Sequence, residues 1–183
     1  MKRVAVWLLL AALGGTALAQ DAPSALADPA ALKPRHHGYA FEQPDVLLRQ
    51  RLFGLAHGLS LLAAACLDLP EQAGSTQEAY AAWHLKQAAT IETIVLDLAH
   101  YYYGERAAEA GWTDLTRALS LKENIQDALG GVQIEDACAT LPTAIARPRY
   151  ELDRLLAEGK VDAAPPAEPA PAPATPETGK TAE

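Results

Sequence analysis

The stretch LLRQRLFGLAHGLSLLAAAC, residues Leu47–Cys66, decides the expected fold. Its apolar residues recur at alternating spacings of four and three, which is typical of one face of an α-helix. Asp45, directly after Pro44, can cap the start of this helix. The Leu69-Pro70 pair is expected to end it, because the residue before a proline disfavours helical backbone. The apolar stripe consists of Leu48, Leu52, Leu55, Leu59, Leu62 and Cys66.

Two further helices are expected after this one. The second covers about Thr76–Tyr103, and Gly104 is a typical C-terminal stop. The third begins near Trp112. The pattern Ser120-Leu121-Lys122-Glu123 matches a capping box, which indicates a kink or a new helix ending at Gly130-Gly131.

A fourth helical segment is expected over about 132–158, broken by Pro142 and Pro148 and closed by Gly159. No stretch shows the alternation of a strand over a useful length. The sequence therefore predicts an all-α, four-helix bundle-like single domain over 45–159.

The N-terminus MKRVAVWLLLAALGGTALAQ has the pattern of a secretory signal peptide. Lys2 and Arg3 precede ten consecutive apolar residues, Val4–Leu13, and Ala17-Leu18-Ala19 is a small-x-small cleavage site. We expect residues 1–19 to be removed and the protein to be exported, to the periplasm as first choice and to the medium as second. No later segment is expected to be apolar enough to span a membrane.

The expected domain is flanked by segments in which proline and small residues predominate. Gln20–Pro44 carries four prolines and is expected to form a flexible leader. The segment 160–183 carries six prolines and no aromatic residue. Such a composition cannot bury enough surface to offset the loss of chain entropy, so a disordered tail is predicted there.

The charge and the cysteines limit the possible partners and the compartment. Removal of residues 1–19 leaves 13 Lys+Arg against 23 Asp+Glu, a net charge of −10, which disfavours binding to nucleic acid or to anionic lipid. Cys66 and Cys138 form an even pair, so a single disulfide is expected after export. Two free buried thiols are the alternative.

The common catalytic and cofactor motifs are missing from the sequence. There is no His-Glu-x-x-His, no Cys-x-x-Cys, no glycine-rich phosphate loop and no Gly-x-Ser-x-Gly. Met1 is the only methionine, so the mature protein cannot hold a haem or copper through a methionine ligand. The sequence predicts no enzyme, no cofactor and no metal.

Three histidines remain as candidates for binding. His100 follows Asp97 by one helical turn, which places carboxylate and imidazole side by side, and Tyr103 is expected on the same face, whereas Tyr101 and Tyr102 are expected in the core. His84 is expected on the inner stripe Ile91, Val95 and Leu98, level with His57 across a helical hairpin. The adjacent His36-His37 pair is expected to be solvated in the leader.

Glycines and aromatic residues suggest possible contact surfaces. Gly54 and Gly58 share one helical face, where either a neighbouring helix or a partner could approach the backbone. Phe53, Trp83 and Trp112 are expected to anchor the core, and an aromatic groove for a peptide or apolar ligand is an alternative use of the second helix.

From these features we expect an exported, non-enzymatic helical domain that binds an envelope protein or a peptide. The first alternative is a small-molecule or metal binder that uses histidines and tyrosines of the bundle. The second alternative is an enzyme with an Asp97/His100 acid–base pair.

Overall fold

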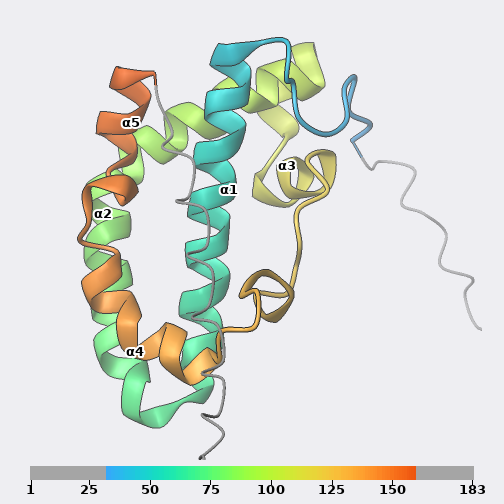
Figure 1. Cartoon of the computed structure of the whole chain (residues 1–183). Helices are drawn as coiled ribbons and strands as arrows, with labels where there is room; N and C mark the ends of the chain where they lie inside the picture. The colour runs from blue at the N-terminus through green and yellow to red at the C-terminus, as the bar shows by residue number, and fades with distance from the viewer. Residues whose placement is uncertain (1–31, 160–183) are drawn as a thin grey trace, which may run out of the picture. The chain divides into compact units, whose positions relative to one another are not determined.

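The computed structural model describes residues 32–159, which form helices and no strand. The predicted signal peptide, the first part of the leader and the predicted tail lie outside the described residues. The all-α prediction is confirmed. The four-helix arrangement is not, because the described residues form five α-helices (Figure 1). They are α1 (Pro44–Ala65), α2 (Pro70–Tyr103), α3 (Trp112–Ala118), α4 (Ile134–Ala144) and α5 (Leu152–Glu158), with the 3₁₀ turns η1 (Cys66–Asp68), η2 (Gly104–Glu109), η3 (Gln126–Ala128) and η4 (Pro148–Tyr150).

The core is built on a hairpin of α1 and α2, which form the most extensive contact between two helices. Figure 1 shows the two helices running alongside one another, joined by the short η1 turn. Leu52 and Phe53 of α1 and Ile94 and Leu98 of α2 are at most 1% exposed. Full burial of such a side chain stabilises a fold by about 1.5–3 kcal/mol, so this seam is a main source of stability.

The turn between the two long helices differs from the sequence-based prediction. Pro70 does end the first helical region, but it is also the first residue of α2, so α2 begins six residues before the expected Thr76. Proline suits this position because the first helical N–H has no partner within the helix. The predicted end is confirmed, since Gly104 follows α2 with a φ of 59°.

The buried face of α2 is rotated relative to the predicted stripe. Trp83, Gln87 and Ile91 are buried, whereas His84 is exposed. The prediction that His84 lies on the inner stripe is therefore wrong. The physical reason for this difference is that α2 packs against α1, α4 and α5. The buried face of α2 is therefore wider than a single stripe, and near His84 it passes through Trp83, one residue earlier in the sequence.

The third helix is much shorter than expected. α3 ends at Ala118, and Ser120 has a φ of 55°, a left-handed conformation that stops the helix. The N–H of Leu121 bonds to the carbonyl of Thr116 across this turn, at 2.9 Å. The predicted continuation through the capping box at Ser120–Glu123 to Gly130-Gly131 is therefore wrong, and only η3 forms there.

Pro142 lies inside α4, which was expected to break at this residue. A proline removes the N–H that would bond to the carbonyl four residues earlier, which here belongs to Cys138. That carbonyl instead accepts a hydrogen bond from the Thr76 hydroxyl of α2, at 3.3 Å. The tertiary contact compensates the missing helical bond, and α4 continues to Ala144.

The predicted disulfide between Cys66 and Cys138 is confirmed, with a Cα–Cα distance of 5.6 Å. It joins η1, at the turn of the hairpin, to α4. Both cysteines are fully buried.

The described part of the predicted leader, residues 32–43, lies against the helices, and we call it the N-terminal strap. The N–H of Arg35 bonds to the carbonyl of Tyr102 at 2.6 Å, and the N–H of Gly38 bonds to the carbonyl of Ala118 at 2.9 Å. The N–H of Ala40 bonds to Oε1 of the buried Gln50, at 2.8 Å. The strap is thus held by backbone hydrogen bonds, where the sequence indicated a loosely ordered chain.

By length and composition, α1 with η1 (Pro44–Asp68) could cross a membrane, with a mean hydropathy of 1.2. The prediction that no segment after the signal peptide is this apolar is therefore corrected. In the fold, one face of α1 packs against α2, α4 and α5. A core helix passes the same test of length and composition, so this feature is weak support for a membrane span.

Candidate functional site

The predicted cluster of Asp97, His100 and Tyr103 does not assemble. Nε of Arg49 lies 2.6 Å from Oδ2 of Asp97, so an α1 guanidinium engages this carboxylate. His100 is exposed beside this pair, on a shallow depression. Tyr103 is 4% exposed and its hydroxyl donates to the carbonyl of Asp114, at 2.8 Å. This side chain therefore belongs to the core, and its burial raises the pKa of the phenol.

The other two tyrosines of the triple-tyrosine run have separate roles. Tyr102 is fully buried, as predicted, and its hydroxyl donates to the carbonyl of Gly38 in the strap, at 2.6 Å. Tyr101 is only half-buried and stacks on His36 of the strap, with 4.5 Å between ring centroids. The run therefore joins the end of α2 to the strap. His36 is exposed, as expected, although its ring lies on Tyr101.

The predicted pair of His57 and His84 is also separate. The indole N–H of Trp112 donates to Nδ1 of His57 at 3.2 Å, and Nε2 of His57 lies 2.9 Å from the carbonyl of Lys122. Because indole nitrogen only donates, Nδ1 is the acceptor and Nε2 carries the proton. His57 thus holds the loop after α3, whereas His84 is exposed near the ring of Tyr80.

The glycine face of α1 is not a close contact between helices. A Cβ at Gly54 would lie 3.6 Å from the Tyr39 hydroxyl of the strap, and one at Gly58 would meet nothing within 4 Å. Among residues 32–159 no group of three or more histidine, cysteine, aspartate or glutamate side chains is arranged to hold a metal ion.

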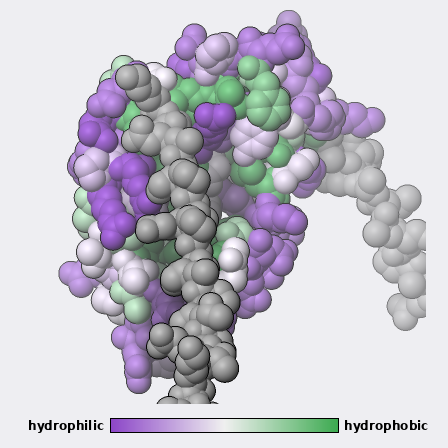
Figure 2. Space-filling view, in the orientation of Figure 1, coloured by the Kyte–Doolittle hydropathy of each residue, from purple (hydrophilic) through white to green (hydrophobic). Residues whose placement is uncertain are grey.

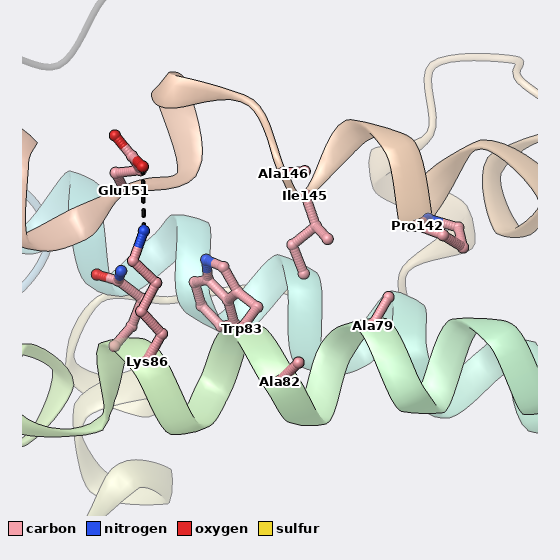
Figure 3. A pocket seen from close by; sticks show the side chains of 9 residues that line it. Ala79, Ala82, Trp83, Lys86, Pro142, Ile145, Ala146 and Glu151 are labelled. Carbon is pink, nitrogen blue, oxygen red and sulfur yellow. Dashed lines mark hydrogen bonds and ion pairs between the residues drawn. The ribbon is translucent and has the colours of Figure 1, made fainter.

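The best-formed candidate site is a groove of about 380 Å³ between α2 and the α4–α5 connection. In Figure 3, Ala79, Ala82 and Trp83 rise from α2 and face Ile145 and its neighbours on the opposite segment. Apolar side chains form most of the groove, and an ion pair lies at one end. The lining residues are Ala79, Ala82, Trp83, Lys86, Gln87, Pro142, Ile145, Ala146 and Glu151.

Two polar contacts shape this groove. Trp83 is 7% exposed, and its indole N–H donates to the carbonyl of Tyr150 at 2.8 Å. Its polar atom is therefore occupied, and the ring offers only apolar surface. Nζ of Lys86 lies 3.1 Å from Oε1 of Glu151, which neutralises the charge at the groove end.

Gln87 lies fully buried below the groove. Its Oε1 accepts the N–H of Asp153 at 3.1 Å, while its Nε2 has no hydrogen-bond acceptor among the described residues. Burial opposes ionisation of Asp153, but the backbone N–H groups of Arg154 and Asp153 and the charge of Lys86 lower the pKa of its carboxyl. The amide of Gln87 is therefore close to the start of α5, and we assign it to holding α5 rather than to a ligand.

The surface around these elements is largely polar. Figure 2 shows hydrophilic side chains around the edge of one face, with smaller hydrophobic areas between them. Exposed large apolar side chains occur singly, as is usual for a folded surface. They include Phe41, Leu67, Leu85, Leu96 and Val132.

The sequence indicated only one wall of the groove. Trp83 was expected in the core, and an aromatic groove on the second helix was an alternative. No local pattern indicated that Pro142 and Ile145 would face α2, because their approach to α2 depends on the Thr76–Cys138 contact and on the disulfide.

No family model, no curated protein and no solved structure matches this chain.

Proposed function

We propose that the protein is exported to the periplasm and binds an extended segment of an envelope protein or peptide without catalysing a reaction. The observation that supports the proposal most is the apolar groove between α2 and the α4–α5 connection, closed at one end by the Lys86–Glu151 pair. The signal-peptide pattern of residues 1–19 supports export. Secretion to the medium is the second choice.

The dimensions of the groove suit a short extended segment. Its α2 wall runs from Ala79 to Gln87, eight residue steps of a helix, or about 12 Å. An extended chain covers this length with about four residues. Ala79 and Ala82 have small side chains that admit a peptide backbone, and the small exposed parts of Trp83 and Ile145, which are 7% and 5% exposed, are apolar.

The proposal is tested by filling the groove. Ala82 lines it and is exposed, whereas the neighbouring Ala81 is also exposed but does not line it. After crosslinking in the native cell, we expect a partner to co-purify with the wild type and with Ala81→Arg, but at least tenfold less with Ala82→Arg. Enrichment no greater than that of an unrelated periplasmic protein, or equal recovery with both variants, refutes the proposal.

No contact among the described residues specifically favours either of the two alternative functions. Asp97 is engaged by Arg49 and His100 stands on an open surface, which does not favour an acid–base pair in a cleft. His57 and His84 bond or stack with different neighbours, which does not favour a shared metal or ligand.

A further inference from the structure

The chain leaves the described fold close to the groove. Glu151, at the groove end, directly precedes α5, and Gly159 directly follows α5. These points are eight residue steps apart along the helix, or about 12 Å. An extended chain covers this distance in about four residues, so the five residues 160–164 are long enough to return to the groove.

The residues that come next have the chemistry that the groove would accept. Residues 165–173 read PPAEPAPAP, with proline at five of nine positions. Proline favours the polyproline II conformation, which rises about 3.1 Å per residue. About four such residues match the 12 Å of the α2 wall. Proline rings dock on aromatic surfaces, and Trp83, which is 7% exposed, offers a narrow edge of its ring in the groove.

The charge of the segment is also compatible with the groove end, where Lys86 is exposed and already pairs with Glu151. Among the lining residues the single cation is Lys86, whose side chain is 58% exposed. Glu168 is the only charged residue within 165–173. It can approach Lys86 from the solvent side, at the end of the groove nearest to α5.

We propose that residues 165–173 of the chain itself occupy the groove and compete with the external partner. This inference rests on the proposed function and adds its regulation. A tethered segment acts at an effective concentration of about 1 mM. With an intrinsic dissociation constant of the same size, it fills the groove for about half of the time, and a tighter external segment displaces it.

The test places a photocrosslinking residue on the groove wall of the full chain. Ala82 is replaced by a small aliphatic photoreactive residue that carries a diazirine, which leaves more of the groove open than Ala82→Arg does, and the matched control carries the same residue in place of Ala81. Irradiated, dilute, purified protein is analysed by mass spectrometry of its peptides. We expect intramolecular crosslinks from position 82 to residues 165–173, at least fivefold stronger than from position 81.

A second variant tests the role of the prolines. We expect the position-82 crosslink to fall severalfold in the variant with Pro165→Ser, Pro166→Ser, Pro169→Ser, Pro171→Ser and Pro173→Ser. Labelling of an external polypeptide at position 82 in cells should then rise about twofold, because the groove is free for twice as long. If the change at position 82 prevents folding, the probe is moved to Ala146, which also lines the groove and is exposed.

The remaining outcomes overturn the inference in distinguishable ways. If the crosslinks to residues 165–173 are equally strong from positions 81 and 82, or are absent, these residues do not occupy the groove. Crosslinked dimers assign the groove to a second copy of the chain. If position 82 labels an external polypeptide but never the tail, the regulation fails and the proposed function stands. If it labels neither, both fail.

Discussion

The hydrogen bonds between Gln50, Tyr102 and the strap allow a quantitative prediction. Nε2 of Gln50 donates to the Tyr102 hydroxyl at 2.7 Å and to the carbonyl of Gly38 at 3.3 Å. Oε1 of Gln50 accepts the N–H of Ala40, and the Tyr102 hydroxyl donates to the same Gly38 carbonyl. Gln50 and Tyr102 are both fully buried, so water cannot replace a lost partner without entering the core.

Tyr102→Phe removes two of these bonds but leaves the Gln50 amide and the Gly38 carbonyl bonded to each other. We therefore expect a loss of about 1–2 kcal/mol in the free energy of unfolding. Gln50→Leu also leaves the Ala40 N–H without an acceptor, so its cost should be larger, about 2–3 kcal/mol. The double variant should lose less than the sum, by about 1 kcal/mol, because both changes remove the same bond.

Urea unfolding followed by circular dichroism measures these energies, and amide hydrogen exchange locates the effect. The exchange of the Ala40 amide should accelerate in Gln50→Leu, while amides in the middle of α2 keep their protection relative to global unfolding. Tyr101→Phe is the matched control and should stay within about 0.5 kcal/mol of the wild type. The reasoning would be refuted if the losses of the two single variants added to that of the double variant within about 0.3 kcal/mol, or if the exchange rate of the Ala40 amide were unchanged in Gln50→Leu.

Three further predictions concern the disulfide, alkaline pH and metals. Replacing Cys66 and Cys138 by serine opens a loop of 72 residue steps and should cost about 4 kcal/mol in urea unfolding; a loss below 1 kcal/mol would contradict the chain-entropy argument. Burial raises the pKa of Tyr102 above its ordinary value of about 10. Stability should therefore be complete below pH 10 and fall as the pH rises above it, less steeply in Tyr102→Phe; equal slopes would exclude Tyr102 as a source. Zinc, copper and haem should leave the Tm of the purified protein unchanged, and a rise of several degrees with any of them would revive the ligand-binding alternative.

The sequence predicted the features that depend on local chain chemistry. The stripe of α1, the stop at Gly104 and the pairing of Cys66 with Cys138 follow from periodicity, glycine conformation and an even number of cysteines. Each requires only the neighbouring residues or the number of cysteines, so a single sequence carries the information.

The features that failed depend on contacts between distant residues. Which face of α2 is buried near His84 depends on the packing of α1 on one side and of α4 and α5 on another. Pro142 stays helical because Thr76, 66 residues away, bonds to the carbonyl that proline leaves free. The strap is ordered by Gln50, whose polarity alone gave no sign that it would be buried. The groove is missed for the same reason, since only its Trp83 wall is visible as a local pattern.

The position of the disulfide also determines how the fold would respond to a pulling force. Cys66 precedes α2 and Cys138 lies in α4, so the covalent loop contains all of α2 and α3. Once the strap has detached from Tyr102 and Ala118, a tension applied to residues 32 and 159 passes through the sulfur bridge, and the covalent chain of those helices carries no load. The 72 enclosed residue steps hold about 240 Å of hidden contour length, which reduction would release. In the oxidised state, α1 and α5 bear the tension, while α2 keeps its shape.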